Sequence, residues 1–122
     1  MPLEQKLYTA LTTSTLVTTL SSNRVYPLRS PQDSAYPHIV YTRIGGERYN
    51  GIAGYLETEH PTLQIDVYST SYSEAKSLSL NIHTVLDGTT TFRAVLLSDS
   101  DLYEDAVDKY RVTSDYGFIN HE

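Results

Sequence analysis

The clearest alternation of apolar and polar positions in the chain begins at Pro61. Leu63, Ile65 and Val67 are apolar and the residues between them are polar, which is the period of a strand with one buried face. After Ser69 the period changes, and apolar residues recur at helical spacing, at positions 75, 78, 82, 85 and 86. The pattern predicts a strand, a sharp turn and a helix that lies back over the sheet.

Both ends of this helix carry capping signals. Ser71 suits the N-cap, and Glu74 stands three residues further on, as in a capping box. Asp87 and Gly88 are expected to end the helix, because glycine takes the left-handed conformation at a helix C-terminus with little steric cost.

The N-terminal third predicts a short amphipathic helix followed by two strands. Leu3, Leu7 and Leu11 recur at helical spacing, and a further turn or two is expected over residues 16–20. The elements expected next are a strand over 24–27, a loop over 28–37 and a strand over 38–44, which Gly45 and Gly46 break or bulge.

Residues 47–59 are the least regular part of the pattern. Gly51 and Gly54 exclude a stable helix there, yet four apolar or aromatic residues, Tyr49, Ile52, Tyr55 and Leu56, stand in what is expected to be a surface loop. A long loop in a small domain is usually functional. The alternative interpretation is the tip of an extended β-hairpin.

The C-terminal part predicts two strands, over 91–97 and 110–119, joined by an acidic loop. The loop contains Asp99, Asp101, Glu104 and Asp105. The order α-β-β-β-α-β-β favours an α+β fold in one domain, residues 1–122. We expect a mixed or mostly antiparallel sheet of about four to five strands packed by two helices.

Composition and charge narrow the function classes. The 122 residues include no cysteine, which excludes disulfides and thiolate metal sites. The net charge of −6 and the scattered lysines and arginines argue against sequence-specific nucleic-acid binding. No apolar run is long enough for a membrane span, and the start of the chain lacks a signal-peptide pattern, so a cytosolic protein is expected. The 11 tyrosines hint at interfaces.

Metal binding has little support. Hard cations need several oxygen ligands, but the spacing of the acidic loop is not that of an EF-hand, so a solvated loop or one facing a basic partner is favoured. The histidines, His38, His60, His83 and His121, form no zinc-binding motif. His38 and His60 could approach each other on adjacent strands, although solvent-facing positions are favoured. No metal site and no cofactor are expected.

Asp66 is the one candidate for a catalytic base, since it stands in the middle of a strand on the polar face. The favoured interpretation is structural, an ion pair with an arginine on a neighbouring strand such as Arg43 or Arg24. No nucleophile elbow and no glycine-rich phosphate loop occurs. We therefore expect a protein that is not an enzyme and has no catalytic residues, with a metal-assisted hydrolase using Asp66 or the acidic loop as a remote alternative.

Leu80 lies almost opposite the apolar stripe of the predicted helix, among polar residues. One exposed leucine needs no explanation. Together with the glycine- and tyrosine-rich segment 45–59, this exposed leucine favours a contact between subunits.

Short motifs in a fixed order along the whole chain resemble a known family. They are Leu7-Tyr8 and Leu11, Arg24-Val25-Tyr26-Pro27, Pro31-Gln32, Tyr36-Pro37-His38-Ile39-Val40-Tyr41, Gln64-Ile65-Asp66-Val67-Tyr68, Tyr72-Ser73-Glu74-Ala75, Leu86-Asp87-Gly88, Tyr110-Arg111-Val112 and Asp115-Tyr116. In these motifs the chain resembles the tail-completion, or tail-terminator, proteins of long-tailed bacteriophages and gene-transfer particles.

The resemblance implies a small α+β subunit that closes into a hexameric ring in the neck of a virion, after assembly in the host cytoplasm. Such a ring caps the tail tube and joins it to the head, so the partners implied are the tail tube protein and a head-closure or connector protein. DNA would pass through its channel. Another neck component, a head-closure or connector protein, is the alternative.

Two sets of residues are the candidate contacts of such a ring. The first is expected to touch a neighbouring subunit or the tube: Gly45, Gly46, Tyr49, Ile52, Tyr55, Leu56 and Leu80. The second is expected to face the channel or a partner: Asp99, Asp101, Glu104 and Asp105.

Overall fold

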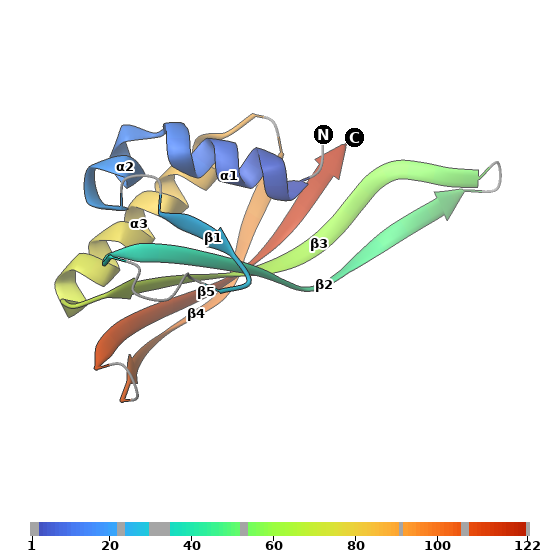
Figure 1. Cartoon of the computed structure of the whole chain (residues 1–122). Coiled ribbons are helices and arrows are strands. Elements are labelled where there is room, and N and C mark those ends of the chain that lie inside the picture. The colour runs from blue at the N-terminus through green and yellow to red at the C-terminus, as the bar shows by residue number, and fades with distance from the viewer. Residues whose placement is uncertain are drawn as a thin grey trace.

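The structure is a computed structural model that describes residues 3–21, 24–29, 35–51, 54–90, 92–105 and 108–121, with the backbone alone for 46–51, 54–60 and 120–121. Along the chain the elements are α1 (Leu3–Thr13), α2 (Thr15–Ser21), β1 (Val25–Pro27), β2 (His38–Gly51), β3 (Gly54–Ser69), α3 (Tyr72–Gly88), β4 (Arg93–Glu104) and β5 (Lys109–His121) (Figure 1).

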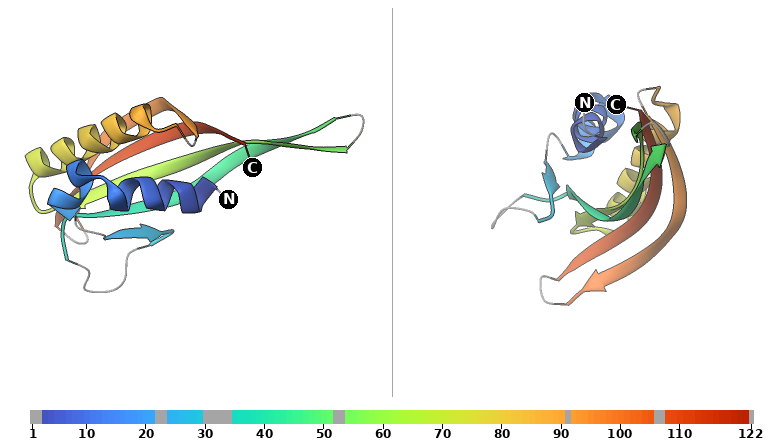
Figure 2. Two further views of the ribbon diagram at one scale, coloured as in Figure 1. Left: turned by 90° about the horizontal axis from the view of Figure 1, so that it is seen from above. Right: turned by 90° about the vertical axis from the view of Figure 1, so that its right-hand side faces the viewer.

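The five strands form one mixed sheet in the order β1-β2-β3-β5-β4. β1 is parallel to β2, and every other neighbouring pair is antiparallel. The helices lie on one face of this curved sheet (Figure 2). The predicted α+β class is confirmed, and the further turn or two expected over 16–20 is the helix α2, so three helices rather than two pack the sheet.

The core lies between the helices and the sheet. Leu63, Ile65 and Val67 of β3 are buried there, as their alternation predicts. The other large members of the core come from the three helices and from β2 and β5: Leu3, Leu7, Leu11, Val17, Leu78, Ile82, Leu86, Ile39, Tyr116 and Phe118.

The N-terminus of α3 has Ser71 as its N-cap, as predicted, and Ser69 also takes part in the capping hydrogen bonds. Ser71 is the N-cap, and its hydroxyl accepts a long hydrogen bond of 3.5 Å from the Glu74 N–H. The Glu74 carboxylate does not return to Ser71; it accepts a hydrogen bond of 2.6 Å from the hydroxyl of buried Ser69, which itself accepts from the Ser71 N–H at 3.1 Å.

At the other end, α3 includes Gly88, and Thr89 is the C-cap in an extended conformation. The expected left-handed glycine is therefore wrong. The described residues that are not glycine and have positive φ are Leu28 and Asp108, in the turns after β1 and before β5.

The segment expected to be irregular, 47–59, is a β-hairpin. β2 and β3 continue antiparallel to the pair Gly51 and Gly54, with register shifts after Arg43 and after Arg48, so the alternative of an extended hairpin tip is confirmed. Residue Ile52 lies outside the described residues. We call the paired segments 46–51 and 54–60 the arm. Figures 1 and 2 show that it projects away from the helices and from β4.

The predicted acidic loop is also a strand. β4 runs from Arg93 to Glu104 and pairs with β5 along its whole length, with one irregularity between Leu96 and Ser98. Asp99, Asp101 and Glu104 are therefore strand residues, and the turn begins only at Asp105.

Candidate assembly surfaces

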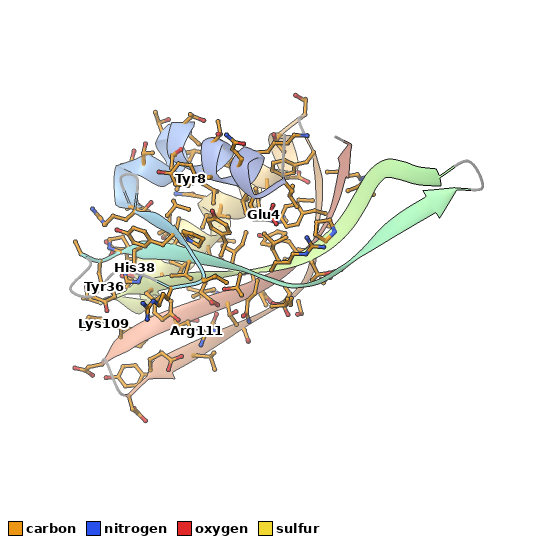
Figure 3. All side chains as sticks on the ribbon, turned by 45° about the vertical axis from the view of Figure 1, so that its right-hand side comes forward. Glu4, Tyr8, Tyr36, His38, Lys109 and Arg111 are labelled. Carbon is orange, nitrogen blue, oxygen red and sulfur yellow. The ribbon has the colours of Figure 1, made fainter. Side chains whose placement is uncertain are left out.

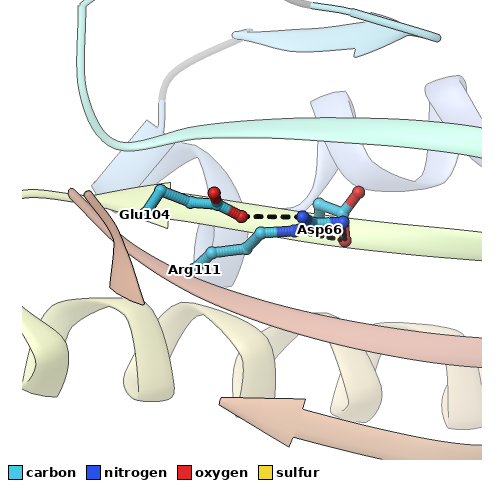
Figure 4. A network of polar contacts seen from close by, with 3 residues as sticks. All are labelled: Asp66, Glu104 and Arg111. Carbon is cyan, nitrogen blue, oxygen red and sulfur yellow. Dashed lines mark hydrogen bonds and ion pairs between the residues drawn. The ribbon is translucent and has the colours of Figure 1, made fainter. Parts of the chain in front are cut away.

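The sheet face that the helices leave uncovered carries an ion-pair network (Figure 4). Asp66 of β3 is only 4% exposed. One of its carboxylate oxygens accepts a hydrogen bond from Nε of Arg111 on β5 and forms an ion-pair contact with Nη2, both at 3.2 Å. The third nitrogen, Nη1, donates to Glu104 of β4 at 2.8 Å. The guanidinium also lies 5.7 Å from the centre of the Tyr68 ring, a cation–π distance.

This network shows what Asp66 does in the fold. Arg111 holds the Asp66 carboxylate, and through Glu104 the network joins β3, β5 and β4. This is the structural role that the sequence favoured. The predicted partners are wrong: Nε of Arg43 donates to the Gly45 carbonyl oxygen and Nε of Arg24 to the Pro37 carbonyl oxygen.

Beside the network, His38 packs against three aromatic rings, and Figure 3 shows it next to Tyr36. Its ring centre lies 4.7 Å from that of Tyr36, 5.2 Å from Tyr68 and 6.0 Å from Tyr26. Nδ1 lies 3.2 Å from the Ala35 carbonyl oxygen, so it carries the proton and donates, since a carbonyl only accepts. Burial of the imidazole, aided by the charge of Arg24, lowers the pKa of His38.

The solvent-facing position expected for His38 is wrong, because its side chain is 2% exposed. The alternative approach to His60 is wrong as well. Across the β2–β3 pair, His38 stands opposite Tyr68 whereas His60 stands opposite Glu47. In the described part of the chain, no group of three or more acidic or histidine side chains could hold a metal ion.

The helix-bearing side of the sheet is open at its β4 edge. A groove of about 940 Å³ lies between the C-terminal half of α3 and the start of β4, with Leu86, Phe92 and Leu96 among its lining residues. Val95 and Leu96 of β4 are exposed in it, at 48% and 38%. Edge strands of soluble monomers usually avoid such exposure, so this edge is a candidate interface.

Leu80 is 64% exposed on α3, as its place outside the apolar stripe predicts. It is one turn from both Lys76 and His83 on the same helix face. Lys76 Nζ lies 3.3 Å from Asp101 of β4, and His83 lines the groove. Leu80 therefore belongs to the face of α3 that borders β4.

The four predicted acidic residues do not form one surface. By their register with β5, Asp99 and Asp101 point to the helix side of the sheet, opposite Ser114 and Val112. Glu104 points to the other side, where it pairs with Arg111. Asp101 accepts hydrogen bonds from the Tyr72 hydroxyl at 2.5 Å and from Lys76.

The other predicted contact residues lie in or next to the arm. Gly45 is exposed at the first register shift of β2, and a Cβ added there would meet no atom within 4 Å. Gly46 and Tyr49 are on β2, and Tyr55 and Leu56 are on β3. Sequence reasoning missed the β4 edge; its signal was the cluster of apolar residues at 95–97.

The open sheet edge, the groove and the projecting arm define a small α+β structural subunit. The family model for tail completion protein gp17 matches residues 5–120. The chain belongs to this family, and it is a tail structural protein of the phage type.

A solved structure shares the fold. A chain from the virion of a native gene transfer agent particle superposes with a TM-score of 0.78 at 16% identity, covering 98% of this chain and 95% of that chain. A crystal structure from Akkermansia muciniphila matches with a TM-score of 0.42 at 10% identity, covering 68% and 42%, too low to support any inference. No curated protein matches the sequence. Among the described residues, no helix is long and apolar enough to cross a membrane.

Proposed function

We propose that this protein is a ring-forming tail terminator, which caps the tail tube and joins the tail to the head in the neck of a virion. The observation that carries the proposal is the match to the tail completion family over residues 5–120. The surfaces support it: a closed ring needs two different patches on each subunit, and the arm and the β4 edge are two such patches. In this proposal the protein acts through shape and contacts and catalyses no reaction.

The ring is proposed to be hexameric and to assemble in the host cytoplasm with the tail tube protein on one side and a head-closure or connector protein on the other. Native mass measurement of the purified protein, with and without tube subunits, tests this. Six copies in either state are the expected result. A monomer in both states would overturn the proposal.

The contacts of the ring are proposed to include the arm and Leu80. Gly45, Gly46, Tyr49, Tyr55 and Leu56 would touch a neighbouring subunit or the tube, as would Ile52. Deleting residues 47–57 removes the part of the hairpin outside the core, so the variant is expected to fold and yet fail to terminate tails. Tails of normal length from that variant would refute this role.

A second part of the proposal concerns DNA. Asp99, Asp101 and Asp105 would give the channel a negative lining that repels passing DNA, whereas Glu104 points to the other side of the sheet. Asp99 and Asp105 form no ion pair with a described residue, whereas Asp101 and Glu104 do. The double variant Asp99→Asn, Asp105→Asn therefore removes two negative charges without breaking an ion pair between described residues. Slower DNA ejection is expected from particles that carry it, and an unchanged ejection rate would count against a lining by these two residues.

A further inference from the structure

The groove between α3 and β4 is lined by both polar and apolar side chains, and Val95 and Leu96 are its exposed large apolar residues. Its walls include the apolar side chains of Leu86, Phe92 and Leu96, and His83, Asp87 and Arg93 supply its polar margin. Leu96 is exposed although it lies on the helix side of the sheet, where its register partner Tyr116 is buried. Leu86 and Phe92 are already buried in the core, so a partner at the groove gains apolar burial mainly from Val95 and Leu96, at about 25 cal/mol per Å².

The backbone of β4 adds a requirement on the shape of that partner. β4 is the last strand of the sheet, and its outer edge pairs with no other described strand. Over 12 residues it therefore presents unpaired N–H and C=O groups next to exposed Val95 and Leu97. A partner strand satisfies these groups and covers the side chains together.

Within the same chain, the outer parts of β2 and β3 also have edges that pair with no other described strand. β1 pairs with β2 only up to Tyr41, and β5 pairs with β3 only from Thr58 onward. Past these points the hairpin is a two-stranded ribbon, which is marginally stable alone in water. From Thr42 to Gly51 the free edge of β2 is about 34 Å long at about 3.4 Å per residue, close to the length of β4.

We propose that the arm of one subunit adds as a strand to the β4 edge of a second copy, beside the α3–β4 groove. The arm contains Glu47, Glu57 and Glu59 against one arginine, Arg48, and β4 itself carries Asp99, Asp101 and Glu104. The free edges of β4 and of the hairpin, and not net charge, therefore support this pairing, with Arg93 as the cation of β4 that the arm can meet. Arg93, at the groove, is exposed and forms no ion pair with a described residue. The arm and the groove are different surfaces, so repetition of the contact produces a head-to-tail ring.

This inference rests on the proposed ring and assigns its contact. The natural absence of cysteine allows a direct test by cross-linking. The full chain is prepared with one cysteine on the arm, Tyr49→Cys, Tyr55→Cys or Leu56→Cys, and a second in the groove, Leu96→Cys. A short bis-maleimide then joins thiols that lie close together. A ladder of covalent dimers to hexamers on denaturing gels is the expected result for at least one arm position.

Leu16→Cys replaces Leu96→Cys in the matched control, since Leu16 is also an exposed leucine but lies on α2. This control is expected to give no species larger than the dimer. Rings that native mass measurement detects but that give no ladder from any arm position would overturn the docking contact and leave the ring intact. Equal ladders from test and control would also overturn it. A protein that stays monomeric with and without tube subunits would overturn the ring itself.

Discussion

At the residue scale, the Asp66–Arg111 pair is the polar contact whose loss is expected to lower the stability of the fold most. Asp66 is 4% exposed, and its carboxylate accepts a hydrogen bond from Nε of Arg111 and forms an ion-pair contact with Nη2. A buried charge that loses its partner costs far more than an exposed one, because water cannot replace the lost hydrogen bonds. The pair also links β3 to β5 and, through Glu104, to β4.

We predict that Arg111→Met lowers the free energy of unfolding by about 3 kcal/mol, because it leaves the Asp66 carboxylate buried without a cation. Urea denaturation measures the change. Lys76→Met breaks the Lys76–Asp101 pair, whose side chains are 39% and 36% exposed, and is the control, expected to cost less than about 1 kcal/mol. Equal losses from the two variants would contradict the structural role of the buried pair.

His38 predicts a pH dependence of stability. Burial, with the nearby charge of Arg24, lowers its pKa from 6.5, so the unfolded chain takes up a proton at a higher pH than the folded protein does. The contribution of neutral His38 is present above about pH 6.5 and is lost as the pH falls below it.

The free energy of unfolding, measured between about pH 7.5 and pH 5.5, should therefore decrease, since this window lies above the ordinary carboxyl range. His38→Phe keeps an aromatic ring and should flatten the decrease. His83→Gln, at an exposed imidazole, should retain it. A decrease of the same slope in His38→Phe would show that another group is responsible.

For single residues, the sequence predicts which type of contact a side chain makes better than it predicts which residue is the partner. An aspartate in the middle of a strand indicates an ion pair, but Arg111 is 45 residues away and becomes the neighbour only because β5 lies beside β3. Strand order is a property of the whole sheet and is not contained in a local pattern. The burial of His38 has the same origin, since Tyr68 reaches it from the opposite strand.

At the scale of elements, α3 shows how a local signal becomes a three-residue cap. Ser69 is fully buried and bridges the Ser71 N–H and the Glu74 carboxylate. It joins the end of β3 to the first turn of α3, and the negative charge of Glu74 is favourable at a helix N-terminus.

We predict that Ser69→Ala costs more stability than Ser71→Ala. The first substitution leaves the Ser71 N–H and the Glu74 carboxylate without a partner, at about 1–3 kcal/mol, whereas the second removes one long cap bond, at about 1 kcal/mol or less. Thermal unfolding ranks the two variants. Ser73→Ala, an exposed position whose hydroxyl contacts only that of Ser71, should change stability least, and a reversed order would refute the bridging role of Ser69.

Elements with one buried face were predictable, and those without one were not. β3 and α3 bury alternate or helically spaced positions, so their periods are visible in the sequence. Nearly every residue of β4 is exposed, which erases the alternation, and its serines and aspartates are typical of loops. The arm was obscured by its glycines, since Gly51 and Gly54 interrupt any regular pattern there.

At the scale of the whole molecule, the surfaces that lack a partner are gathered at the sheet edge and in the arm. The core beneath the helices is built from residues of α1, α2, α3 and the central strands, and it is complete within one chain. The outer edge of β4 and the free edge of the ribbon are not completed by any described segment. We infer that folding is a property of one subunit, while these edges are completed by assembly.

Hydrogen exchange distinguishes the core, which forms within one chain, from the strand edges that assembly is proposed to complete. In isolated subunits, amides of β2 and β3 beyond Gly46 and Thr58 should exchange much faster than those of α3, because two strands without a third have little free energy of opening. In assembled rings the amides of the arm and of β4 should become protected, while those of α3, already bonded within the helix, should change little. Mass spectrometry of peptides from the two states measures this. Protection confined to α1 and α2 would mean that subunits meet through the helical layer, and the arm would then be free to contact the tube alone.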